Sequence, residues 1–403
     1  MRKLFSKAVA VVLAGAMTIG LSACGGGGSN GTSGGSSGES KGKKATIGVA
    51  FYQDSGLAVD ATKAYLESIG GDLNTTFKYT VLTQTDEATN VQKVQELISS
   101  GVDGVICTMD LGTNSILEEC EAAGVYLGGY ICDYDTSYTQ NYDKVFKSDY
   151  FVGTATDGQN PDDVTIGKTM LESLKEYNER NADAPLTHVS MAIFPEYAFP
   201  SQKTGADQFV QEVEAYNKDA DVKITVDPLD EQTDVLQFSP VDSTYFSKHA
   251  DSQAIISFAA GTAFVYPTMV SAGVDSKLKL FTTGFEGGED ENFGSNGKQT
   301  YQQCMVTAVE SITYPLVLIL NKINGKEFSD MPEDAERVSS SQFLVNSDED
   351  MEIFKKTTYY TGKAENAMFT GKDVLNMTAY ANENATYSDL KGLLSKLTIE
   401  DVK

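Results

Sequence analysis

The sequence has very little histidine and no tryptophan, and negative side chains far outnumber positive ones. Two histidines among 403 residues leave little material for a metal site or for general-base catalysis. Lysine and arginine total 31 against 57 aspartates and glutamates, so the formal net charge is −26. A chain this acidic repels phosphate backbones, and we expect no binding to nucleic acid. The composition favours a binding protein over an enzyme, with no cofactor and no metal.

The N-terminal segment has the features of a secretion signal. Arg2, Lys3 and Lys7 precede an apolar run over residues 8–19. A spanning helix needs roughly 20 apolar residues, so this run is too short to anchor the mature chain. The sequence Leu21-Ser22-Ala23-Cys24 follows and resembles a bacterial lipobox, in which the cysteine is acylated.

This resemblance implies that residues 1–23 are a lipoprotein signal peptide and that Cys24 carries the lipid anchor. The protein would then be tethered to the outer face of the bacterial cytoplasmic membrane. A plain signal peptide with an incidental cysteine is the alternative. Residues 24–43 are rich in glycine and serine, which is typical of a flexible tether with a reach of roughly 25 Å.

The remaining cysteines are Cys107, Cys120, Cys132 and Cys304, and no CxxC pair occurs among them. Their irregular spacing argues against a zinc site. Cys107 and Cys132 end two consecutive predicted strands and could approach each other. Buried free thiols are the favoured interpretation.

From residue 44 onward, short β-type runs alternate with segments of helical periodicity. The predicted strands are residues 45–51, 77–82, 102–108, 125–132, 150–156, 188–194, 222–226, 254–258 and 278–283. The predicted helices are residues 57–69, 88–100, 114–123, 160–180, 201–216, 241–249 and 263–272, with Asn160 and Pro161 starting the fourth. Apolar strands that alternate with helices indicate parallel, doubly wound sheets, and the two successive units indicate two α/β lobes.

After the second unit, a long apolar stretch over residues 306–323 predicts a helix that Pro315 kinks or divides. Residues 341–345 predict one more strand, and helical pieces are expected near residues 350–356 and 387–397. We expect residues 44–183 with about 304–336 to form an N-terminal lobe, and residues 184–303 with about 340–350 a C-terminal lobe. Residues 351–403 form an extension whose placement the sequence leaves open.

Several familiar motifs fail when their spacing is checked. Gly167-Lys168-Thr169 suggests a phosphate-binding loop, but Asp162 stands where that motif requires glycine. No GxSxG nucleophile, HExxH zinc motif or EF-hand loop occurs. We expect His188 and His249, at the edges of a predicted strand and helix, to be structural.

The order of elements together with the lipobox resembles the type I solute-binding proteins of ABC importers, most nearly the ribose/galactose-type sugar-binding branch. The resemblance covers about residues 44–345. It implies two doubly wound lobes joined by three hinge crossovers, with ligand held at the carboxyl ends of the strands.

The resemblance also suggests positions for the ligand contacts. These are Tyr52, Gln53 and Asp54 after the first strand, Asp110 after the third, Asp133 and Tyr134 after the fourth, Tyr197 and Gln202 in the second lobe, Phe258, Glu286 in Gly284-Phe285-Glu286, and Gln303 with Gln302 as its rival. Carboxylates and amides bind sugar hydroxyls, and aromatic rings, which here include Phe199 and Phe285, cover the apolar C–H surface.

Three positions depart from the pattern of this branch. Phe258-Ala259 stands where the family often has Asn-Asp, Leu111 stands where arginine is common, and no arginine occurs near Gln202. These departures weaken the case for a simple pentose.

The resemblance implies a monomeric, extracytoplasmic protein that binds a small polar solute, a sugar first of all, and delivers it to an ABC permease. A sensor that presents its ligand to a membrane receptor, and a binder of a nucleoside or peptide-like solute, remain alternatives. A lipid-anchored hydrolase is a third alternative, although no activated nucleophile is evident.

Overall fold

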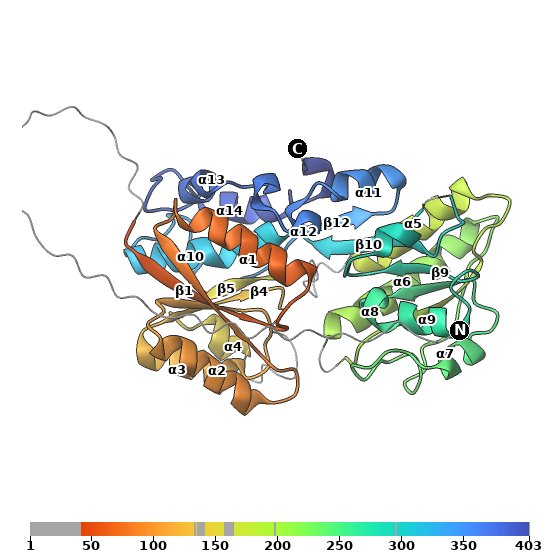
Figure 1. Ribbon diagram of the computed structural model, residues 1–403, viewed down its shortest axis with the longest axis horizontal. Helices are drawn as coiled ribbons and strands as arrows, with labels where there is room; N and C mark the ends of the chain where they lie inside the picture. Colours follow the sequence, from red (N-terminus) through yellow and green to blue (C-terminus); the bar gives the residue numbers. More distant parts are fainter. Residues whose placement is uncertain are drawn as a thin grey trace, which may run out of the picture. The chain divides into compact units, whose positions relative to one another are not determined.

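The structure is a computed structural model that describes residues 42–132, 134, 142–156, 165–196, 199–294 and 296–402. In these residues the chain builds two six-stranded sheets with helices packed on their faces (Figure 1). Each sheet with its helices is called a lobe below.

The first lobe is built on parallel strands in the order β11-β5-β4-β3-β1-β2. The strands are β1 (Ala45–Phe51), β2 (Thr75–Val81), β3 (Gly104–Cys107), β4 (Tyr126–Tyr130), β5 (Phe151–Thr156) and β11 (Arg337–Ser339). β1 lies between β2 and β3, and all but one of its residues are buried, as expected for a strand covered on both faces.

The helices of the first lobe are α1 (Leu57–Gly70), α2 (Glu87–Ser99), α3 (Thr113–Ala123), α4 (Tyr142–Phe146) and α10 (Thr313–Asn324). Two glycines let α10 lie close to the sheet. A Cβ atom at Gly104 would be 2.4 Å from Ile319 Cγ2, and one at Gly128 would be 2.8 Å from Pro315 Cβ. Any larger side chain at either glycine would push this helix away from the sheet.

The second lobe is built on strands in the order β12-β10-β9-β8-β6-β7, with β12 antiparallel to β10. The strands are β6 (His188–Ala192), β7 (Thr225–Val226), β8 (Ala254–Ser257), β9 (Lys279–Thr282), β10 (Tyr301–Thr307) and β12 (Gln342–Val345). The helices are α5 (Ile166–Arg180), α6 (Pro200–Asp219), α7 (Ser243–Lys248), α8 (Gly261–Phe264) and α9 (Tyr266–Ala272).

The chain passes between the two sheets three times: after β5, after β10 and after β11. The second crossover contains the short 3₁₀ helix η3 (Val309–Ile312), and the third consists of Ser340 and Ser341. The predicted class of two doubly wound lobes joined by three crossovers is therefore confirmed.

The lobe boundaries differ from the sequence-based expectation. Helix α5 packs on α6, where a Cβ atom at Gly167 would lie 2.3 Å from the carbonyl oxygen of Gly205. The Tyr177 ring lies 6.0 Å from that of Phe281 in β9. Helix α5 thus belongs to the second lobe, which begins at the crossover after β5 and not at residue 184. Strand β10 also pairs in the second sheet, so the first lobe resumes only after it.

The prediction of one long helix over residues 306–323 is wrong about where the helix begins. Residues up to Thr307 belong to strand β10, and the helix begins at Thr313. Pro315 then falls in the first turn of α10, where a missing N–H costs no helical hydrogen bond, so it starts the helix and does not kink it.

Residues 346–402, called the C-terminal extension below, follow β12. They contain α11 (Asp348–Phe354), α12 (Thr358–Thr361), α13 (Gly371–Asn376) and α14 (Tyr387–Leu394). Helix α11 lies beside β12 of the second lobe, whereas α13 and α14 lie beside α1 and α10 of the first (Figure 1). The extension therefore passes from one lobe to the other.

The two histidines meet in one cluster of the second lobe. Asp227 accepts from both of them, with 2.6 Å between Oδ1 and His188 Nε2 and 2.6 Å between Oδ2 and His249 Nδ1. The other nitrogen of His249, Nε2, lies 3.0 Å from Oδ1 of the buried Asp234. The cluster fastens the segment after β7 to the start of β6 and to the end of α7, which is a structural role.

Candidate functional site

The loop after β1 brings Tyr52 and Gln53 to the carboxyl edge of the first sheet. The backbone N–H of Tyr52 donates to Thr108 Oγ1 at 2.8 Å, which fastens this loop to the residue that follows β3. Burial, followed by the charge of Glu286, raises the pKa of the Tyr52 hydroxyl. Glu286 comes from the loop after β9 in the other lobe.

Glu286 lies in a loop after β9 that is shaped by glycines and by a second carboxylate. Glu289 is only 1% exposed, and it accepts from the backbone N–H of Glu286 at 2.5 Å and of Gly287 at 2.7 Å. Gly287 and Gly288 have φ angles of 105° and 90°, which a residue with a side chain rarely adopts. Glu286 itself remains open to solvent.

Desolvation and the neighbouring charge of Glu289 both raise the pKa of Glu286 above its ordinary value. A hydrogen-bond donor that approaches the Glu286 carboxylate stabilises its charged form, because the donor offsets both the desolvation and the repulsion from Glu289. Glu286 is thus suited to accept hydrogen bonds from a polar ligand.

Gly56, in the loop after β1, lies near both Gln53 and Glu286. A Cβ atom at Gly56 would lie 2.6 Å from Gln53 Nε2 and 3.8 Å from Glu286 Oε2. A Cβ atom at Gly287 would lie 3.4 Å from Leu57 Cδ1. Tyr52, Gln53 and Glu286 therefore share one region between the lobes, and we call these three residues the interlobe site.

Asp110 lies at the carboxyl end of β3 and is 6% exposed. Its carbonyl oxygen accepts from the hydroxyl of Thr113 at 2.7 Å at the start of α3. The charge of Asp110 contributes, after burial, to the raised pKa of the Cys132 thiol that follows β4. Asp110 is thus at the same edge of the first sheet as Tyr52 but largely covered.

Asp54, by contrast, is exposed, and its backbone carbonyl accepts a hydrogen bond from Lys63 Nζ at 2.9 Å.

Three other predicted ligand residues, Tyr134, Phe258 and Gln303, face inward and contribute to packing, and Gln202 is half-buried in α6. The buried Tyr134 ring lies 5.1 Å from that of Phe151, and Phe258 is 1% exposed within the core beside α6. Gln303 is fully buried and its Nε2 lies 3.0 Å from Met170 Sδ, while Gln202 Oε1 accepts from the N–H of Phe194 at 2.8 Å. A residue just after a strand can turn toward the core or the edge, and sequence position alone does not decide which.

Asp133, Tyr197 and Cys24 were also predicted as functional and lie outside the described residues. The predicted rival of Gln303, Gln302, is 1% exposed, and its Nε2 donates to the carbonyl of Gln299 at 2.7 Å.

An aromatic cluster at the carboxyl edge of the second sheet was found only in part from the sequence. Phe194 follows β6, and its ring lies 4.8 Å from Phe264, 5.3 Å from Phe199 and 5.4 Å from Phe238. Phe199 is 38% exposed, so part of this apolar surface is open. Only Phe199 was among the expected aromatics, because Phe194 and Phe264 belong to a predicted strand and a predicted helix and were assigned to packing, and Phe238 lies outside every predicted element.

Tyr359 is the residue at this region that sequence reasoning missed entirely. It comes from α12 in the C-terminal extension, and its hydroxyl donates to the carbonyl of Phe285 at 3.1 Å. Burial is the main cause that raises the pKa of the Tyr359 hydroxyl, and the charges of Tyr52 and Glu286 raise it further. No local pattern indicates such a contact, since it joins segments far apart in the sequence.

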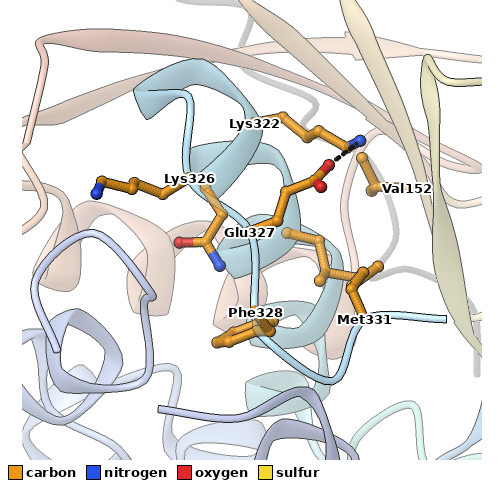
Figure 2. A pocket seen from close by; sticks show the side chains of 8 residues that line it. Val152, Lys322, Lys326, Glu327, Phe328 and Met331 are labelled. Atoms are coloured by element: carbon orange, nitrogen blue, oxygen red, sulfur yellow. Dashed lines mark hydrogen bonds and ion pairs between the residues drawn. The ribbon is translucent and has the colours of Figure 1, made fainter. Parts of the chain in front are cut away.

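Two cavities of the described chain are lined by other residues. One of about 340 Å³ opens at the third crossover. It is lined mainly by hydroxyl side chains: Thr165, Thr169, Ser339, Ser340, Ser341, Ser395 and Thr398, together with Ile166, Met305, Gln342 and Leu344. Beside α10 a cavity of about 10 Å³ lies between Val152, Phe328 and Met331, next to the ion pair of Lys322 and Glu327 (Figure 2). That volume suffices for about one water molecule.

All four cysteines after residue 42 are buried free thiols. Cys132 Sγ lies 3.3 Å from the carbonyl oxygen of Cys107, so the two residues approach each other without a disulfide bond.

Across the described ranges, no helix combines the length and the apolarity that a membrane crossing requires.

No family model matches the sequence, and no curated protein matches it. Solved structures do match the fold. A solute-binding protein of an ABC transporter from Agrobacterium vitis, bound to α-D-tagatopyranose, has 11% identity and a TM-score of 0.56, over 75% of this chain and 95% of that one. A periplasmic solute-binding protein from Actinobacillus succinogenes with bound D-allose has 13% identity and a TM-score of 0.54, over 75% and 98%.

This is the fold of the type I solute-binding proteins. A structure assigned as a LacI-type transcriptional regulator, from Bacteroides fragilis, shares it at 14% identity and a TM-score of 0.51, over 77% of this chain and 99% of that one. The type I fold by itself therefore does not decide what this chain does. The matches cover nearly all of each neighbour but only about three quarters of this chain, so this chain has segments beyond the shared fold.

Proposed function

We propose that this chain is the solute-binding protein of an ABC importer and that it holds a small polar solute, a sugar first of all, between its two lobes. The observation that carries the proposal is the interlobe site. Tyr52 and Gln53 from one lobe and Glu286 from the other meet at the strand ends where open parallel sheets bind ligands.

The chemistry of these side chains suits a polyhydroxylated ligand. A carboxylate accepts hydrogen bonds from hydroxyl groups, and an amide both donates and accepts. The open face of the phenylalanine cluster around Phe194 offers an apolar surface on which C–H groups of a sugar ring can pack. Sugars are bound by two of the structural neighbours named above, which supports this ligand class.

In the proposed mechanism, ligand contacts with both lobes favour the arrangement in which the lobes are together. A ligand shifts such an equilibrium only by its differential affinity for the two arrangements, and contacts from both sides supply that difference. The permease would recognise the ligand-bound arrangement, and acylated Cys24 would keep the protein at the membrane surface.

A thermal-shift screen tests the proposal. The protein is melted with D-allose, D-tagatose, D-arabinose and L-rhamnose, and with nucleosides and amino acids as competing classes. A ligand present at 100 times its Kd adds about 2.7 kcal/mol of stability, which is a shift of several degrees. Stabilisation by one sugar supports the proposal. Stabilisation by nucleosides or amino acids alone would refute the ligand class, and no response from folded, ligand-free protein would refute sugar binding.

A further inference from the structure

The C-terminal extension is fixed to the second lobe by aromatic contacts. The Phe354 ring at the end of α11 lies 5.0 Å from Phe285 and 6.3 Å from Phe343 of β12. The hydroxyl of Tyr360 donates to Asp290 Oδ2 at 3.0 Å. Phe285 directly precedes Glu286, so the extension packs on the loop that carries this residue, whereas Asp290 lies beyond that loop in the short 3₁₀ helix η2 (Glu289–Asn292).

The same extension is fixed to the first lobe by buried polar contacts. The hydroxyls of Tyr387 and Tyr314 are 2.7 Å apart, and the N–H of Ala379 donates to Asn321 Oδ1 at 2.9 Å. Both partners in the first lobe belong to α10, which packs on the sheet. Figure 1 shows α13 and α14 over this lobe and α11 over the other, with α12 between them. The extension is thus a further connection between the lobes.

Two of the three crossovers are fastened by the extension as well. In the second crossover, Glu310 is 2% exposed and accepts from the backbone N–H of Met368 at 3.2 Å. In the third, the backbone N–H of Ser341 donates to the carbonyl oxygen of Leu394 at 2.9 Å. The Ser341 hydroxyl donates to the carbonyl oxygen of Ser395 at 3.0 Å. The extension therefore contacts both lobes and two of the segments that join them.

Tyr359 of the C-terminal extension contacts the loop that carries Glu286 of the interlobe site. Its side chain is buried, and its hydroxyl satisfies the buried carbonyl of Phe285, the residue before Glu286. The Glu286 loop contains glycines at positive φ and has wide conformational freedom when it is not held. A hydrogen bond from a rigidly packed helix reduces this freedom and so lowers the entropy cost of ordering Glu286 on a ligand.

We propose that the C-terminal extension is a working part of the interlobe site, and that Tyr359 is a positioning residue that holds the Glu286 loop for ligand. The inference rests on the proposed function for its ligand, but the loop contact stands on its own geometry.

The test compares Tyr359→Phe with Tyr360→Phe in the full chain. Both variants lose one tyrosine hydroxyl from α12, but only Tyr359 donates to the Glu286 loop backbone. If the free energy of one buried hydrogen bond is lost from ligand binding, the dissociation constant rises about tenfold. We expect Tyr359→Phe to weaken binding of the most stabilising sugar of the panel about tenfold by calorimetry, and Tyr360→Phe to change it less than about threefold.

Hydrogen exchange of residues 284–288 is the second readout, and it needs no ligand. We expect faster exchange of this segment in Tyr359→Phe and no change in Tyr360→Phe, with both melting within a few degrees of wild type. Unchanged exchange and unchanged affinity in Tyr359→Phe would overturn the inference. If wild type binds none of the sugars, the proposed ligand class fails, while the exchange result still decides whether Tyr359 holds the loop.

Discussion

Replacement of His249 tests how the second lobe is held together. Both ring nitrogens face carboxylates, with Nδ1 at 2.6 Å from Asp227 and Nε2 at 3.0 Å from Asp234. A neutral imidazole has only one N–H, so both contacts are satisfied at once only by the charged ring. The side chains of His249 and Asp234 are 3% and 1% exposed, which makes this a buried ion pair.

The pH dependence follows from the direction of each pKa change. Burial alone lowers the pKa of His249, but Asp234 and Asp227 outweigh it and raise the pKa above its ordinary value. Burial alone raises the pKa of Asp227, but His188 and His249 outweigh it and lower that pKa. The stability from His249 is complete below about pH 6.5 and is lost as pH rises through its folded pKa. The stability from Asp227 is complete above about pH 3.9 and is lost as pH falls through its lowered pKa.

We expect His249→Gln to lower the free energy of unfolding by about 3–5 kcal/mol near pH 6, because it leaves the Asp234 carboxylate buried beside an uncharged partner. Urea unfolding between about pH 5 and pH 9 measures this, and the gap to wild type should narrow toward high pH. Lys248→Gln is the control, since its ion pair with Asp230 is at the surface and is worth less than about 1 kcal/mol. An equal loss at pH 5 and pH 9 would refute the charged bridge.

Three further outcomes are expected. Glu286→Gln should weaken sugar binding about tenfold by calorimetry, because it removes the charged acceptor, while the exposed Glu291→Gln should leave binding unchanged. Cys24→Ala should abolish incorporation of labelled palmitate and release the protein from membranes, and persistent labelling would contradict the lipobox. The buried thiols should resist alkylation at pH 8 in the native state and react in urea, since burial, aided by Glu119 and Glu121, raises the pKa of Cys120 to about 12.

The alternation of elements could be predicted because the central strands are buried on both faces and the longer helices have an apolar stripe. β1 matches its predicted range, and α3 ends before Gly124 as expected, with this glycine at φ 70°. Strand β10 was merged with α10 because both are apolar and periodicity does not separate a buried strand from a buried helix over so few residues.

The interlobe site could be predicted where position in the topology determines it. Tyr52 and Glu286 follow strands whose carboxyl ends face the other lobe, and the family resemblance, applied to the order of elements, singled them out. Tyr134 and Phe258 also follow strands, but their rings pack into the core, and only tertiary contacts reveal this. Tyr359 lies outside the repeating pattern altogether, and its role depends on a chain path that the sequence leaves open.

In the proposed function, one ligand is held by both lobes. Hydrogen exchange with and without the most stabilising sugar tests this directly, because protection is read segment by segment. We expect residues 51–57 of the first lobe and residues 284–289 of the second to become protected together, at the same ligand concentration. Protection confined to one lobe, or found only around the cavity at the third crossover, would contradict it.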